Sequence, residues 1–105
     1  MATPYADHGT LVANTVTTVT LTAAGKKRRL RVQNRGTSGS IYYRFGITSP
    51  TDPTVAGDDT FGLPPGATDE WDLDVLGWSP DDIGQSLRYV KLISSGTPDF
   101  SVEAW

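Results

Sequence analysis

Turn-forming residues interrupt this chain at short intervals, and their spacing limits what it can fold into. Seven prolines and 11 glycines are distributed along 105 residues. No window of 11 residues keeps the apolar period of about 3.6 that marks an amphipathic helix. The segments between the turns suit strands of about four to eight residues. We therefore expect an all-β fold.

Several short segments carry the strand pattern directly. Apolar and polar side chains alternate within them, as in strands with one buried face. The expected strands are residues 15–22, 28–34, 41–45, 60–63, 70–75, 87–93 and 100–105, with 11–13 as a short leading strand. This alternation predicts a core of Val32, Tyr43, Trp71, Leu73, Val90, Leu92, Phe100 and Val102. Seven to eight short antiparallel strands at this spacing favour a single β-sandwich or jelly roll, with residues 94–99 joining the last two strands as a hairpin.

The beginning of the chain lacks a comparable pattern. We expect residues 1–14 to form an N-terminal arm and residues 15–105 to form the β-sandwich domain. Tyr5 and His8 are the arm's candidate contacts with a neighbouring protein surface. The first residues resemble no secretory signal, and no apolar run approaches the roughly 20 residues of a membrane span. We expect no membrane partner, and synthesis in a cytoplasm.

Charge is distributed unevenly although the net charge is only −3. Nearly all the bases lie in the first half and nearly all the acids in the second. Lys26, Lys27 and Arg29 belong to one basic cluster that continues to Arg31, and we expect this cluster to face acidic groups on a neighbouring chain or on this one. An acidic pI near 4.8 argues against nucleic acid as the partner, because such binders are usually basic.

No pattern of reactive residues indicates catalysis. The chain has no cysteine, and its one histidine, His8, has no recognisable nucleophile beside it in the sequence. Asp72 and Asp74 lie on the strand face opposite Trp71, which suits a charged solvent face. We expect no enzyme activity, no catalytic residue, no cofactor and no metal site, although calcium binding by an aspartate-rich loop stays open. Trp78 and Trp105 are candidate interface anchors, and glycan stacking by exposed aromatics also stays open.

Five runs of the sequence resemble those of small structural proteins of tailed bacteriophages. They read LRVQNRG at 30–36, IYYRFG at 41–46, LPPGA at 63–67, VKLISSGT at 90–97 and SVEAW at 101–105. The resemblance spans residues 15–105 and implies a non-enzymatic capsid decoration protein, of β-sandwich or jelly-roll type. It implies a homotrimer on the outer surface of the virion, with the major capsid protein as partner. A tail or head-fibre component and a carbohydrate-binding β-sandwich module are the alternatives.

Overall fold

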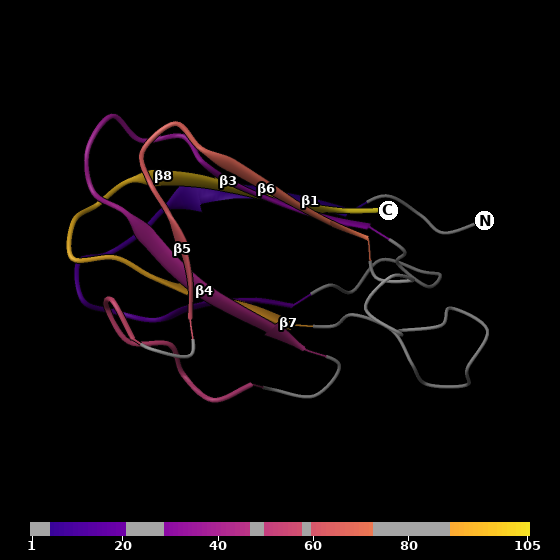
Figure 1. Ribbon diagram of the computed structural model, residues 1–105, viewed down its shortest axis with the longest axis horizontal. Coiled ribbons are helices and arrows are strands. Elements are labelled where there is room, and N and C mark those ends of the chain that lie inside the picture. The colour runs from indigo at the N-terminus through magenta and orange to yellow at the C-terminus, as the bar shows by residue number, and fades with distance from the viewer. Residues whose placement is uncertain (1–4, 21–28, 47–49, 58–59, 73–88) are drawn as a thin grey trace.

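The computed structural model describes residues 5–20, 29–46, 50–57, 60–72 and 89–105. These ranges contain eight strands in two four-stranded sheets that pack face to face (Figure 1). No helix among the described residues is long and apolar enough to cross a membrane. The strands are β1 (Tyr5–Thr10), β2 (Thr17–Thr20), β3 (Arg29–Asn34), β4 (Ile41–Gly46), β5 (Phe61–Leu63), β6 (Thr68–Asp72), β7 (Tyr89–Ile93) and β8 (Asp99–Ala104).

The two sheets are built from strands that alternate along the chain. Sheet A has the order β1-β8-β3-β6 and sheet B the order β2-β7-β4-β5. All neighbouring strands are antiparallel. Only the connection from β4 to β5 stays within one sheet, and every other connection crosses between the sheets. The predicted all-β sandwich is therefore confirmed.

The core lies between the inner faces of the sheets. Its fully buried side chains include residues of β2, β3, β4, β5, β7 and β8, with Leu11 beyond the end of β1. The prediction is confirmed for Val32, Tyr43, Val90, Leu92, Phe100 and Val102. Trp71 packs against this core but is only partly buried, because β6 is the last strand of its sheet. Leu73 lies outside the described residues.

The predicted N-terminal arm is wrong for residues 5–11. Residues 5–10 form β1, which pairs with β8 so that Tyr5 lies opposite Ala104 and His8 opposite Ser101. Leu11 follows with 1% of its surface exposed, and its N–H donates to the Pro98 carbonyl at 3.0 Å. Backbone pairing with β8 holds this segment in place, and such pairing does not require alternating side chains. The expected leading strand at 11–13 is not formed.

The predicted hairpin between the last two strands is also wrong. β7 belongs to sheet B and β8 to sheet A, so the connecting residues cross from one sheet to the other. Ser94 begins this crossing with no exposed surface, and its Oγ accepts the Gly96 N–H at 3.2 Å. Its carbonyl accepts the Asn14 N–H at 2.7 Å.

Asn34 fixes the turns at the end of the sandwich where β3 finishes. Its buried side-chain amide donates to the carbonyls of Gly39 at 2.9 Å and Leu63 at 3.0 Å. Its Oδ1 accepts the Gly36 N–H at 3.0 Å. A Cβ on Gly36 would lie only 2.7 Å from Pro98 Cβ, so no larger residue fits without movement. The asparagine and glycine of the VQNRG run therefore have structural roles.

Candidate interaction surfaces

The outer face of sheet A is a charged surface organised around Arg31. Its Nε and Nη2 both donate to Glu70 Oε1, at 3.0 and 2.8 Å, which joins β3 to β6. Its Nη1 lies 3.7 Å from Glu103 Oε2 on β8. The hydrogen bonds that Arg31 donates to Glu70 are the main reason why the pKa of Arg31 is raised. Part of the basic cluster is thus neutralised by acids of the same chain, one of the two partners expected from the sequence.

Trp105 belongs to the same surface. The Arg31 guanidinium carbon lies 5.2 Å from the centre of the Trp105 ring, which is cation–π geometry. The Trp105 N–H and carbonyl exchange hydrogen bonds with the backbone of Arg29, at 3.1 and 2.8 Å. The ring is half-buried. Trp105 is therefore held in place by its own domain, and the exposed part of its ring remains available to a partner.

His8 lies further along sheet A, beside a buried hydroxyl. Its Nδ1 lies 2.6 Å from Ser101 Oγ, and the two residues face each other in the β1–β8 register. Ser101 is only 2% exposed, so its hydroxyl is poorly placed to attack a substrate. The neighbouring Asp99 carboxylate accepts a hydrogen bond from Thr10 Oγ1 at 2.5 Å. The histidine has a hydroxyl beside it, but within the described residues it makes no hydrogen bond to an acid.

Two shallow hollows lie near this end of sheet A, and they share Arg35 and Asp99. One is lined by the turn after β3 together with Thr97 and Pro98, and the other by residues 8–10 with Phe100. The Arg35 N–H donates to the Asp99 carbonyl at 2.8 Å, which holds the two segments together. Each hollow is lined by both a cation and an anion, so neither has the single charge that would select an ionic ligand.

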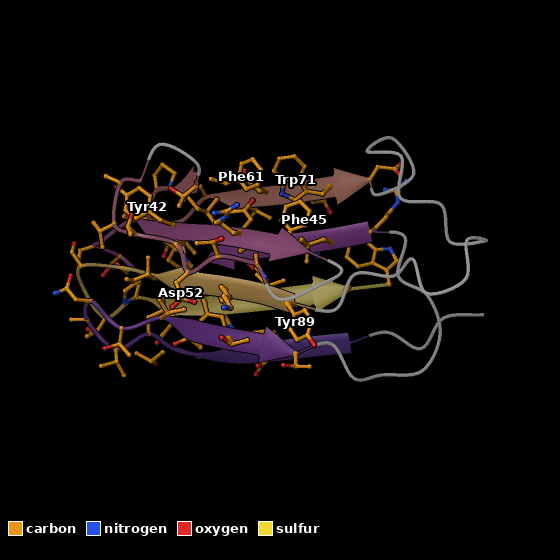
Figure 2. The ribbon with its side chains drawn as sticks, turned by 90° about the horizontal axis from the view of Figure 1, so that it is seen from below. Tyr42, Phe45, Asp52, Phe61, Trp71 and Tyr89 are labelled. Carbon is orange, nitrogen blue, oxygen red and sulfur yellow. The ribbon has the colours of Figure 1, made fainter. Side chains whose placement is uncertain are left out.

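A cluster of aromatic rings closes the sandwich between β5 and β6. Figure 2 shows Phe45, Phe61 and Trp71 gathered along this edge. Phe61 is central: its ring centre lies 4.6 Å from that of Trp71, 5.7 Å from Phe45 and 5.4 Å from Tyr43. Phe61 is 41% exposed and Trp71 is half-buried. The described residues therefore present aromatic surface to solvent at this edge.

Below these rings lies a polar chain of three side chains. Trp71 Nε1 donates to the Tyr43 hydroxyl at 2.8 Å, and that hydroxyl donates to Asp69 Oδ2 at 2.7 Å. Tyr43 has no exposed surface. Burial raises the pKa of its hydroxyl above the ordinary value; the Trp71 hydrogen bond opposes this change and Asp69 adds to it. The indole N–H, the phenol hydroxyl and one oxygen of the carboxylate therefore each have a hydrogen-bond partner at this edge.

The outer face of sheet B is partly covered by the segment that follows β4. Asp52 lies over this face in Figure 2 and pairs with Lys91 of β7, with Nζ 2.7 Å from Oδ1. Pro53 is buried, and Ile93 is only 8% exposed although it lies opposite Tyr42 on the outer side of the sheet. The two outer faces therefore differ: sheet A presents paired charges, whereas sheet B carries a covering loop.

The predicted interface residues fall into three groups. His8, Arg29 and Trp105 lie on the outer face of sheet A, with Arg29 exposed at the first position of β3. Tyr5 begins β1, and its side chain lies outside the described part of the structure. The remaining candidates, Lys26, Lys27 and Trp78, are outside it as well. The structure thus brings together Arg29 and Trp105, whose backbones are hydrogen-bonded.

Sequence reasoning missed Asp69 and Phe61. Asp69 is two residues before Trp71, so the same alternation that turned Trp71 inward also predicts an inward aspartate. Phe61 pairs with the buried Tyr43 in the β4–β5 register. Its contact with β6 required knowledge of which strands lie at the sheet edges. The predicted outward position of Asp72 is confirmed by its exposure, while Asp74 is outside the described residues.

Comparison with known proteins identifies the fold but no family. No family model matches the chain, and no curated protein matches it. Among solved structures, it is similar to a de novo designed double-stranded β-helix determined by NMR in solution. The similarity has a TM-score of 0.53 at 12% sequence identity and covers 96% of this chain and 99% of the designed one. At this level of identity the likeness concerns the fold alone.

Proposed function

We propose that this chain is a non-enzymatic structural protein of a tailed-phage virion, made in the host cytoplasm and bound to the outer surface of the capsid. The observation that carries the proposal is the strand order, β1-β8-β3-β6 facing β2-β7-β4-β5. We infer from it an eight-stranded jelly roll, an architecture of viral capsid proteins, lectins and cupins. Architecture alone does not determine function, so the sequence resemblance to phage proteins supplies the choice among these classes.

The chemistry of the surfaces supports a binding role. The described residues contain no group of three histidine, aspartate or glutamate side chains arranged to hold a metal ion. The interior is apolar apart from satisfied groups, since every buried side-chain nitrogen or oxygen in the described ranges has a hydrogen-bond partner. What these ranges offer to another molecule is charge on sheet A and aromatic surface at the β5–β6 edge. Both suit recognition of a protein surface.

The docking surface that we propose is the outer face of sheet A where β3 begins. Arg29 is exposed there, and the basic residues Lys26 and Lys27 lie three and two residues before it in the sequence. Such an arrangement would face acidic groups of the capsid protein. Charge contacts at an exposed rim speed association and weaken with salt, since the Debye length is about 10 Å at 0.1 M.

Co-sedimentation with capsids assembled without this protein tests the proposal. We expect the full chain to sediment with them and Arg29→Glu to bind more weakly, most clearly at low salt. Arg35→Glu is the matched control, because Arg35 is also an exposed arginine but follows the opposite end of β3, away from the proposed docking surface. A chain that never sediments with capsids contradicts the decoration role. Equal losses in both variants contradict the docking surface.

A carbohydrate-binding module is the second candidate, and the aromatic edge favours it. Phe61 presents an exposed ring that lies against the tilted ring of Trp71, and sugars bind to exposed aromatic rings. Asp69 lies beneath them and could accept hydrogen bonds from sugar hydroxyls through its second oxygen. A glycan array scored with the native chain and with Phe61→Ala tests this role. Binding that Phe61→Ala abolishes, without loss of capsid binding, would support it.

A further inference from the structure

The four strands at the sheet edges differ in how they are protected against pairing with another chain. Sheet A ends in β1 and β6, and sheet B ends in β2 and β5. An edge strand has backbone N–H and carbonyl groups on one side that no neighbour uses. Proteins protect such edges with inward-pointing charges, prolines or very short strands. An edge without these features is open to pairing.

Three of the four edges carry such protection. Asp7 of β1 lies opposite the buried Val102, and Asp69 of β6 lies opposite the buried Val32, so both aspartates are on the inner side. A strand added beside either one would bring an aspartate into a dry interface. The remaining strand of the three, β5, has only three residues, and Pro64 and Pro65 follow it at once.

The fourth edge strand, β2, is four residues long and carries neither an inward-pointing charge nor a proline. It reads TTVT, with Val19 buried and with Thr18 and Thr20 exposed on the outer face. The sequence around it has no charged residue from Gly9 to Gly25 and no proline in that range. β-Branched, uncharged segments of this kind are the most prone to pair with another strand. Val12, which is 62% exposed, precedes β2 in the same uncharged stretch.

We propose that β2 pairs with β2 of a second copy of this chain, antiparallel about a twofold axis, so that the two B sheets become continuous. A second copy fits this edge because two identical uncharged strands bring no like charges together. With Val19 on the axis, Thr18 of each copy lies opposite Thr20 of the other on the exposed face. Cross-strand pairs of threonines contribute favourably to such pairing.

The pairing is expected to be weak in solution and stronger on a particle. β2 pairs over only four residues, whereas a stable dimer usually needs about 800 Å² buried on each partner. Copies held on a common surface meet at a high effective concentration, which strengthens a weak contact. A twofold pair also differs from the threefold grouping that the phage resemblance implies, so the two arrangements give different masses.

Sedimentation equilibrium of the purified full chain tests the inference. The average mass should rise with concentration from the monomer value of 11.3 kDa towards twice that value. Thr18→Lys should weaken association by about tenfold or more, because an edge lysine opposes strand addition. Thr68→Lys is the matched control: it places the same charge on an exposed threonine of β6, and it should associate like the native chain.

A charge-complementation experiment makes the test specific for β2 against itself. Thr18→Lys with Thr20→Lys gives one chain, and Thr18→Asp with Thr20→Asp gives another; each alone should remain monomeric. An equal mixture should form a mixed dimer. A native chain that stays monomeric at every concentration, or that forms trimers, overturns the proposal. The proposal is also overturned if the mixture fails to associate, or if either charged chain associates by itself. Capsid binding is measured separately, so either proposal can fail alone.

Discussion

The two sides of this sandwich, where the edge strands of the two sheets face each other, are lined by different kinds of side chain. At the β5–β6 edge, Phe61 and Trp71 bring aromatic rings together across the gap between the sheets, above the Tyr43–Asp69 hydrogen bond. At the β1–β2 edge the described side chains are smaller: Asp7 and Gly9 on β1, and threonines around Val19 on β2. Large aromatic side chains lie between the sheets at the first edge, whereas small side chains and Val19 lie at the second.

We expect the aromatic edge to contribute mainly to folding stability and the β2 edge mainly to self-association. Aromatic rings contribute to stability through buried area and ring contacts, which occupy the space that a partner would need. An edge of threonines buries less, but it leaves a flat row of backbone groups that another strand can use. We therefore expect substitutions at the aromatic edge to change unfolding, and substitutions of the β2 threonines to change self-association.

The largest effect on folding stability should come from removing β1. Deleting residues 2–12 removes β1 and the buried Leu11, and we expect the cooperative unfolding transition to disappear. Leu11→Ala alone should lower the free energy of unfolding by about 3 kcal/mol, measured by urea denaturation. Val12→Ala is the control, because Val12 is largely exposed and should leave the midpoint unchanged. A deleted chain that still unfolds cooperatively would restore the idea of a separable arm.

At the opposite edge, Trp71→Ala should lower the free energy of unfolding by about 3 kcal/mol. This value is at the low end for tryptophan truncation, because the ring is only partly buried. The matched control is Trp105→Ala, which removes an equally large ring from the outer face of sheet A and should cost clearly less. Urea denaturation compares the two. Equal losses would mean that the aromatic edge has no special role in stability.

The hydrogen-bonded chain below the rings predicts a dependence on alkaline pH. Burial raises the pKa of Tyr43, so the folded protein keeps a proton that the unfolded chain releases above about pH 10. Stability is then fully present below pH 10 and falls as the pH rises further, by up to about 1.4 kcal/mol per unit. Free energies of unfolding between pH 9 and 11 measure this slope. Tyr43→Phe should reduce it, whereas Tyr42→Phe on the outer face should not.

The smallest effect is expected on the exposed face beside the same edge. Glu70→Gln removes the carboxylate that pairs with Arg31 between β3 and β6. Exposed ion pairs contribute little, because water solvates both charges and salt screens them. We expect a barely measurable shift of the urea midpoint, smaller at high salt. A loss as large as that of Trp71→Ala would show that the outer face, and not the aromatic edge, secures β6.

Much of the fold could be predicted because alternation is a local property. The register of β3 and β8 follows from their buried positions, and the last strands begin within one or two residues of their expected positions. Residues 5–10 could not be found this way. Their strand state depends on β8, which lies nearly the whole chain away, and Asp7 and Gly9 have low strand preference.

The candidate surfaces were harder to predict than the strands. The basic residues at the start of β3 were visible in the sequence. The acids that pair with Arg31, Glu70 and Glu103, come from two other strands. Strand order determines which side chains share a face, and no local pattern encodes that order. The exposed Phe61 was likewise invisible, because a short strand ending in two prolines gives no sign of its neighbour across the sandwich.

The pairing of β1 with β8 has a consequence for the time at which the protein can form. Tyr5 lies opposite Ala104, so sheet A stays incomplete during synthesis until the final strand has left the ribosome. Non-local strand pairs of this kind slow folding, because a long loop must close before any contact forms. Meanwhile β2, which is uncharged and rich in threonine, is exposed on the growing polypeptide, because its neighbour β7 in sheet B is also synthesised late. Newly made chains should therefore depend on prompt release, or on a chaperone that covers this strand, to avoid aggregating with one another.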